Sequence, residues 1–342
     1  MRKQNLPGMI PIGLIPVIFL LPVILPNYWL HVFALIFIKI ILCLSMRQMM
    51  LTGLLNLSIS AFMGIGAYFS ALMTTTLGFS FWYVILLSGI VCSLIGFLLS
   101  FPLLKIKGVY FFLGSICFSV GIVVLFSNFF VKTFGGMPGF APIAIVKLKL
   151  IGLDVKFTSN LSHYYLTGVV ALLSLIVMKR LEFSRYGLYW KAISQADRLI
   201  ETVGVNLFKY KTFNFVISCF FCGISGSLYA HIIGIITPND FALEFQFILT
   251  TILVVGGFES FWGPVLGVFF LSIVGEILRG FGQYELIGYG FILLFTMIFM
   301  PKGIAGLVEK IYPSRWKKSS WGKNNTSVRS SEGLATSDSK VG

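Results

Sequence analysis

The chain has 342 residues, of which 57% are hydrophobic and 11% charged, and its formal net charge at pH 7 is +14. Soluble domains carry about a quarter charged residues, so this composition excludes a water-soluble globular protein and indicates an integral membrane protein. The basic residues lie between apolar runs and in the tail, as they do in the cytoplasmic loops of membrane proteins, so nucleic-acid binding is not expected.

Apolar runs long enough to cross a hydrocarbon core of about 30 Å predict the membrane segments in chain order. The first run, 9–26, follows a basic start but lacks an A-x-A cleavage site, so we expect it to be retained as a membrane segment. The next predicted spans are 28–46, 53–77, 81–104, 109–130, 163–178 and 212–236.

The pattern changes after residue 245. A short apolar stretch, 245–256, runs into the interruption "GGFESFWGP" (256–264), and the apolar stretches 265–279 and 286–300 follow. The interruption is either a broken helix, of the kind that often frames a transport site, or an ordinary turn at the cytoplasmic face. Counting 245–256 as a crossing predicts an all-α bundle of about ten membrane segments, some short or broken.

Lys and Arg residues set the predicted orientation, because cytoplasmic loops carry an excess of them. They place both termini in the cytoplasm and the loop 131–162 outside. We expect a transmembrane domain over 1–310 and a cytoplasmic tail over 311–342, whose polar composition predicts disorder.

The sequence offers no sign of catalysis, metal binding or a cofactor. It contains no G-x-x-x-x-G-K-[ST] phosphate loop, and its three histidines lie far apart. Cys219 and Cys222 form a C-x-x-C without the second ligand pair that a zinc site needs. We interpret them as small residues at helix contacts, because Cys219, Gly223 and Ser227 recur every four residues, as do Cys222, Gly226 and Ala230.

One segment stands out by its charge. "AISQADRLIETVGVN" (192–206) lies between long apolar runs and contains Asp197, Arg198 and Glu201. We interpret it as a short helix outside the bilayer that inserts into a groove on a partner. The alternative is an amphipathic loop on the lipid headgroups, attracted by the basic residues of 179–211.

Several motifs in a fixed order resemble the permease subunit of branched-chain amino-acid ABC importers, the M-type of two related permeases. They are "LNLSISAFMGIGAY" (55–68), "LLKIKGVYFFLGSICFS" (103–119), "FGGMPGF" (134–140), "SRYGLYWKAISQADRLIETVGVN" (184–206), "TPNDF" (237–241), "VVGGFESFWGPVLG" (254–267) and "MPKGIAGL" (300–307). The resemblance covers roughly residues 40–310. It implies that the chain lies in a lipid bilayer, the bacterial inner membrane.

The resemblance implies a pore formed with an H-type sister permease, two ATP-binding cassette ATPase subunits below it, and an external solute-binding protein. It assigns ATPase coupling to Arg185, Ala192, Asp197, Glu201, Gly204 and Asn206. It places the translocation pathway near Asn56, Ser58, Gly64, Gly66, Tyr68, Gly256 and Gly257. No residue of the chain is expected to be catalytic, since ATP hydrolysis would occur on the partner.

The chain departs from the family pattern at two places. Ser58 and Ile59 stand where the family usually has Gly-His, and Leu199 and Ile200 replace the usual Ala-Ala of the coupling segment. The cargo therefore stays open between branched-chain or similar hydrophobic amino acids and another small polar solute such as urea. A self-sufficient secondary transporter is the alternative from another class, although the absence of Asp and Glu from residues 1–153 argues against ion coupling there.

Overall fold

The structure is a computed structural model that describes residues 22, 26–106, 108–129, 135–143, 147–150, 153–156, 159–195, 204–278, 280, 284–299 and 303–306. The first half contains α2 (Asn27–Met50), α3 (Ile59–Thr75), α4 (Phe81–Leu103), α5 (Val109–Asn128), β1 (Lys147–Leu150) and β2 (Leu153–Lys156). The second half contains α7 (Asn160–Glu182), α8 (Arg185–Gln195), α10 (Leu207–Ile233), η2 (Pro238–Phe241), α11 (Leu243–Gly256), α12 (Gly263–Leu278) and α13 (Glu285–Phe299).

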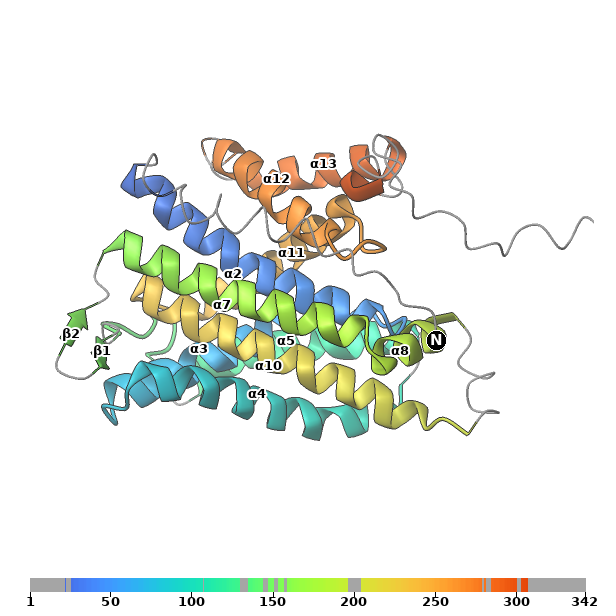
Figure 1. The fold of residues 1–342 in the computed structure, drawn as a ribbon, viewed down its shortest axis with the longest axis horizontal. Coiled ribbons are helices and arrows are strands. Elements are labelled where there is room, and N and C mark those ends of the chain that lie inside the picture. The colour runs from blue at the N-terminus through green and yellow to red at the C-terminus, as the bar shows by residue number, and fades with distance from the viewer. Residues whose placement is uncertain are drawn as a thin grey trace, which may run out of the picture.

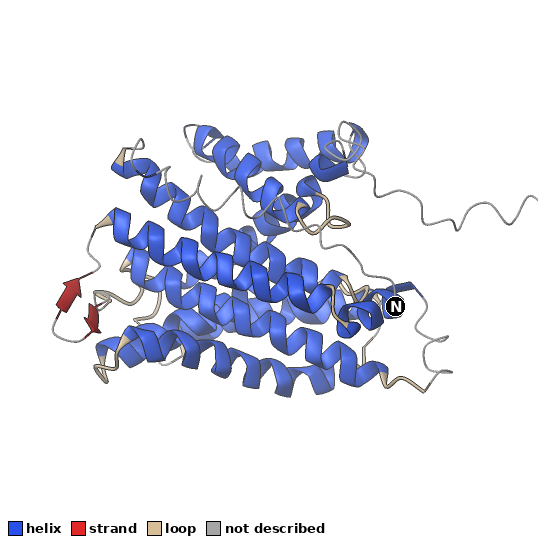
Figure 2. Cartoon of the chain, in the orientation of Figure 1, coloured by secondary structure: helices blue, strands red, loops and turns tan. Residues whose placement is uncertain are grey.

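Long helices lie side by side and form one bundle, with α11, α12 and α13 along one flank (Figure 1). The secondary structure of the described part is helical except for the antiparallel hairpin β1–β2, which lies within the loop predicted to be external, and an isolated bridge between Phe140 and Ile236 (Figure 2). The hairpin is a small departure from the predicted all-α fold. It lies at the end of the bundle opposite α8 (Figure 1).

The predicted spans that fall on described residues agree with the helices to within five residues, except at one place. The run 53–77 was expected to cross as a single helix, but α3 begins only at Ile59. The side chain of Asn56 explains this, because its Oδ1 accepts hydrogen bonds from the backbone N–H (3.0 Å) and the hydroxyl (2.6 Å) of Ser58. Such local side-chain bonds compete with the helical backbone ladder.

Six described helical segments are long and apolar enough to cross a membrane: α2, α4, α5, α7, α10 and Pro238–Gly256. Two shorter apolar helices, Ile59–Thr75 and Gly263–Glu276, accompany them. The predicted segment 9–26 and the predicted tail 311–342 lie outside the described residues, apart from residues 22 and 26. The total of about ten segments and the side of the termini therefore stay predictions.

The outer face of α4 shows why lipid suits this bundle. Leu86, Ile90, Leu94 and Leu98 recur every fourth residue, and each side chain is more than half exposed. A stripe of this kind would be unfavourable in water, whereas hydrocarbon is a matching solvent for it.

Small residues bring α10 close to its neighbours in the centre of the bundle. α10 packs against α2, α3 and α4. A Cβ at Gly223 would lie 2.7 Å from the carbonyl oxygen of Ser88 on α4, and one at Gly226 only 2.0 Å from that of Met63 on α3. The predicted role of this small-residue stripe in helix packing is confirmed.

Candidate coupling site

α8 forms the first half of the segment predicted to couple to an ATPase. Its start is fixed by Ser184, whose hydroxyl accepts a hydrogen bond from the backbone N–H of Tyr186 at 3.2 Å. Asn206 caps the start of α10, because its Oδ1 accepts from the N–H of Lys209 at 3.1 Å. Asp197 and Glu201 fall in 196–203, outside the described residues, so their predicted role stays a prediction.

One face of α8 packs firmly on the bundle. Its buried residues are Gly187, Trp190 and Ile193, spaced three apart as one face of a helix requires. Trp190 is fully buried and its Nε1 donates to the carbonyl of Tyr210 on α10 at 3.1 Å. A Cβ at Gly187 would lie 1.8 Å from the carbonyl oxygen of Glu182, so only glycine lets α8 cross so close to the end of α7.

The other face of α8 points away from the bundle. Arg185 and Ala192, both predicted as coupling residues, are exposed on it, and Gly204 is exposed beyond it with φ +81°. Leu188 is 67% exposed, although it is the most apolar residue of this face. Leu188 was not predicted from the sequence. It follows Gly187 directly and so lies outside the face formed by residues 187, 190 and 193, and this position could have indicated that it is exposed.

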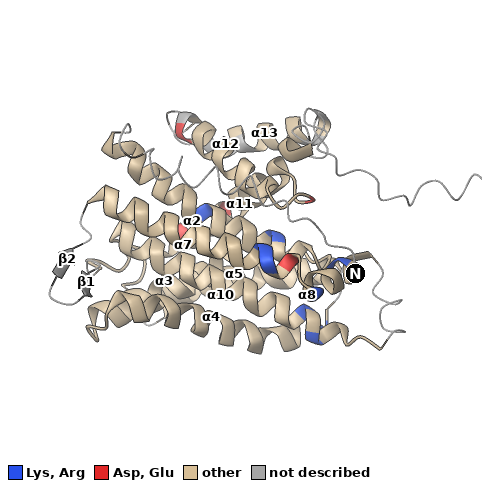
Figure 3. Ribbon diagram, viewed as in Figure 1, with Lys and Arg blue, Asp and Glu red and all other residues tan. Residues whose placement is uncertain are grey.

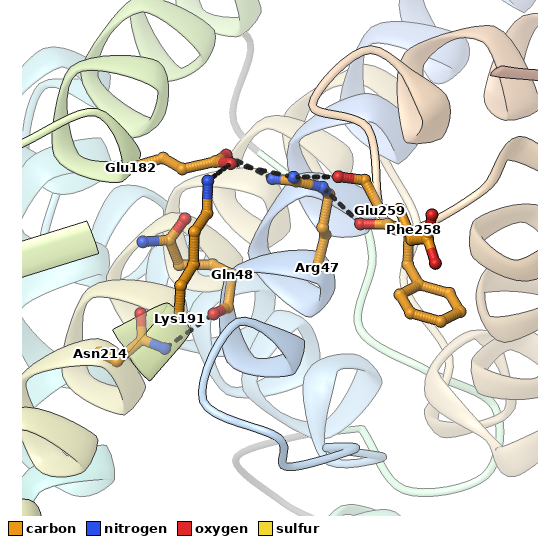
Figure 4. Close-up of polar contacts among 7 residues, drawn as sticks. All are labelled: Arg47, Gln48, Glu182, Lys191, Asn214, Phe258 and Glu259. Carbon is orange, nitrogen blue, oxygen red and sulfur yellow. Dashed lines mark hydrogen bonds and ion pairs between the residues drawn. The ribbon is translucent and has the colours of Figure 1, made fainter. Parts of the chain in front are cut away.

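A buried ionic cluster joins α8 to the rest of the bundle, and we call Arg47, Glu182 and Lys191 the Glu182 cluster (Figure 4). The guanidinium of Arg47 donates to both carboxylate oxygens of Glu182, at 2.5 Å from Nη1 and 3.1 Å from Nη2. Lys191 Nζ on α8 lies 2.8 Å from Glu182 Oε1. The side chains of Arg47 and Glu182 are 2% and 3% exposed, while that of Lys191 is 45% exposed.

Arg47 also reaches the turn between α11 and α12. Its Nε donates to the carbonyl of Phe258 at 2.9 Å, and its Nη2 donates to the carbonyl of Glu259 at 3.3 Å (Figure 4). The interruption "GGFESFWGP" is therefore a turn, at the end of the bundle where α8 lies, rather than a break inside one helix. Glu182 was not singled out from the sequence, although it is the second acidic residue of the chain and ends an apolar run.

The first group of predicted pathway residues is buried around the start of α3. Asn56, Ser58 and Tyr68 are at most 1% exposed. The ring of Tyr68 packs on Phe126 of α5, with centroids 4.3 Å apart. The amide nitrogen of Asn56 has no hydrogen-bond partner among the described residues.

The predicted pathway glycines lie at close backbone or ring contacts. A Cβ at Gly64 would touch the ring of Phe241 at 3.0 Å, and one at Gly66 would lie 2.4 Å from the carbonyl oxygen of Gly223. Gly256 and Gly257 form the start of the α11–α12 turn, where a Cβ at Gly256 would lie 2.3 Å from the carbonyl oxygen of Gly263. These contacts account for the glycines by packing, and their role in a pathway stays a prediction.

A polar seam crosses the bundle beside the start of α3. Gln246 of α11 accepts the backbone N–H of Ser60 at 3.0 Å, and the hydroxyls of Ser60 and Ser119 lie 3.1 Å apart. Ser115 of α5 accepts the N–H of Leu57 at 3.1 Å. Side chains from two other helices thus satisfy backbone donors that the late start of α3 leaves without helical partners.

We expect Trp190→Phe to loosen α8 without unfolding the bundle. Phe keeps most of the ring packing but loses the hydrogen bond to the carbonyl of Tyr210, at an expected cost of about 0.5–1.5 kcal/mol. Thermal unfolding in mild detergent checks this. Tyr189→Phe on the same helix, whose side chain is 37% exposed, is the matched control and should change stability little. Equal stability of the two variants would contradict the anchoring role of Trp190.

Comparison with known proteins shows the family of this chain. The family described as "Branched-chain amino acid transport system / permease component" matches residues 28–301. The high-affinity branched-chain amino acid transport system permease protein LivM of Salmonella typhimurium is 29% identical over 289 residues, which cover 78% of this chain and 67% of that protein. The protein of the same name from Escherichia coli is 28% identical, with the same coverage. No solved structure matches the chain. The chain belongs to the family of permease components of branched-chain amino acid transport systems and is a multi-pass membrane protein.

Proposed function

We propose that the chain is the M-type permease of an ABC importer in a bacterial inner membrane, and that it moves branched-chain amino acids inward by alternating access. Partner ATPase subunits dock on α8, an H-type sister permease completes the pore, and an external binding protein delivers the cargo. Family membership and the names of the relatives support the transport class and the cargo.

One observation carries the coupling part of the proposal. α8 is a polar helix that the bundle holds by one face and leaves exposed on the other, at the end of the bundle where most of the described Lys and Arg residues gather (Figure 3). By the positive-inside tendency, this end faces the cytoplasm. A helix fixed on one side and exposed on the other is suited to transmit force from a cytoplasmic partner.

Co-purification tests the proposal most simply. The tagged chain is extracted in mild detergent from its native membranes, and the proteins that accompany it are identified by mass spectrometry. Recovery of an ABC ATPase together with a second permease is the expected result. Recovery of the chain alone, with solute transport retained in liposomes, would instead indicate a self-sufficient transporter.

We expect Leu188→Glu to weaken ATPase docking while leaving the fold intact. Leu188 is 67% exposed, so the charge meets water in the isolated chain but would enter an apolar contact in the complex. The amount of ATPase retained by the tagged chain should fall at least tenfold, the effect of about 1.4 kcal/mol.

Leu77→Glu is the matched control for this experiment. Leu77 is 60% exposed in the turn between α3 and α4, at the opposite end of the bundle (Figure 1). The same substitution there should leave ATPase recovery unchanged. If both variants retained the ATPase equally, α8 would not be the docking helix.

A further inference from the structure

We propose that Glu182 links α8 to the turn between α11 and α12, with Lys191 on one side and Arg47 on the other, so that displacement of α8 moves this turn. The inference rests on the proposed function, because it requires a partner that displaces α8. It assigns positioning roles to the three residues of the Glu182 cluster, of which Arg47 and Glu182 are buried and Lys191 is partly exposed on α8.

The first step is the contact between α8 and Glu182. Lys191 Nζ lies 2.8 Å from Glu182 Oε1, and the Lys191 side chain is 45% exposed. Because the Glu182 side chain is only 3% exposed, salt screens this ion pair less than a pair on the surface, and the carboxylate follows the ammonium group. It is the part of the Glu182 cluster that responds when α8 shifts.

The second step is the contact between Glu182 and Arg47, which is built to hold. The guanidinium makes two parallel hydrogen bonds to the carboxylate and is 2% exposed. A planar fork that binds both oxygens fixes orientation as well as distance. A movement of the carboxylate is therefore carried to Arg47 instead of being absorbed by a flexible side chain.

The third step leads from Arg47 into the α11–α12 turn. Arg47 donates to the carbonyls of Phe258 and Glu259, and its guanidinium carbon lies 5.5 Å from the ring centroid of Phe261. Backbone atoms and a ring of one turn thus surround one cation. Because the hydrogen bonds are made with main-chain carbonyls of the turn, a movement of the Arg47 guanidinium moves the turn.

The turn has little room in which to absorb such a movement. A Cβ at Gly263 would lie 1.8 Å from the carbonyl oxygen of Gly257, and one at Gly303 would lie 2.5 Å from the backbone nitrogen of Gly257. The end of α11, the start of α12 and the segment 303–306 are therefore packed backbone to backbone. A displacement of the turn is passed to these helices.

The charges of the Glu182 cluster indicate which residue to change. Removing Lys191 leaves the buried Arg47–Glu182 pair intact and without excess charge, so the variant should fold. Lys191→Met keeps the apolar stem of the side chain, and Lys191→Arg keeps the charge. Lys209→Met deletes a charge from an exposed lysine in the first turn of α10 and is the matched control.

The experiment uses the whole importer, with the partners recovered by co-purification, in liposomes that contain the external binding protein. Labelled leucine taken up and ATP hydrolysed are measured together, and their ratio reports coupling. In Lys191→Met the ratio should fall roughly fivefold, the lower end of common coupling effects. Lys191→Arg should restore it, and Lys209→Met should match the wild type.

Each other outcome overturns the inference in a recognisable way. If Lys191→Met left the ratio of leucine uptake to ATP hydrolysis unchanged while the wild type was coupled, the link through Glu182 would be contradicted. The proposed function would not be affected by this result. Loss of uptake and hydrolysis in equal proportion shows that Lys191 acts only on assembly or stability. Absence of ATP-dependent leucine uptake by the wild type contradicts the proposed function itself, and the inference with it.

Discussion

Glu182→Ala should lower the free energy of unfolding by about 3–5 kcal/mol, among the largest effects of any single substitution in this chain. The substitution leaves the guanidinium of Arg47 buried, at 2% side-chain exposure, without its counter-charge. The carbonyls of Phe258 and Glu259 stay bonded to Arg47 but cannot neutralise it. Unfolding in mixed detergent micelles, followed by circular dichroism, measures the loss.

Glu244→Ala is the control for that measurement. Glu244 is an exposed acidic residue in the first turn of α11, where it interacts with the helix dipole. Its removal should cost within about 1 kcal/mol. A cost for Glu182→Ala no greater than that for Glu244→Ala would show that the Arg47–Glu182 pair does not stabilise the fold.

Gly226→Ala should destabilise the bundle by about 1–3 kcal/mol or more, although alanine normally favours helices. The new Cβ would lie 2.0 Å from the carbonyl oxygen of Met63 and 2.8 Å from the backbone nitrogen of Ala67. Both atoms belong to the main chain of α3, so no side-chain rotation can relieve the clash. α10 and α3 must separate, and the same detergent unfolding assay measures the cost.

Gly121→Ala supplies the opposite expectation on α5. No heavy atom lies within 4 Å of a Cβ built at Gly121. Alanine there should leave stability unchanged or raise it by up to about 1 kcal/mol, because it lowers the entropy lost on helix formation. Similar losses for the two glycines would mean that close packing of α10 on α3 is not what requires Gly226.

The helices could be predicted closely from sequence because lipid leaves the backbone few choices. Within hydrocarbon every N–H and C=O must be bonded inside the segment, so an apolar run of sufficient length becomes a helix. The predicted spans 81–104 and 245–256 accordingly match α4 (Phe81–Leu103) and α11 (Leu243–Gly256). Helix packing was also readable, because small residues every four positions marked the contact face of α10.

The start of α3 and the Glu182 cluster could not be predicted in the same way. The late start of α3 depends on where one asparagine side chain bonds, which apolar periodicity does not report. Arg47 and Glu182 are 135 residues apart, and no spacing rule pairs them. The carboxylate that Arg47 and Lys191 share became visible once α2, α7 and α8 were placed together.

The coupling segment combines features that could be predicted from the sequence with features that could not. Its charge and its position between spans predicted a helix outside the bilayer over 192–206. Residues 196–203, with the charged side chains, lie outside the described residues, so this helix stays a prediction, and 192–195 form the end of α8 (Arg185–Gln195). Which of its faces is free depends on the packing of Trp190 and on the close approach at Gly187. The exposed Leu188 therefore emerged from the three-dimensional arrangement.

ATP-dependent uptake of labelled leucine into liposomes tests the central claim most directly. The chain is reconstituted alone and together with its co-purified ATPase, sister permease and binding protein. Each preparation is measured with and without ATP on the side of the membrane where the ATPase lies. Accumulation against a gradient is expected only for the complete assembly with ATP. Uptake by the chain alone, at the same rate and without ATP, would contradict it and identify a self-sufficient transporter.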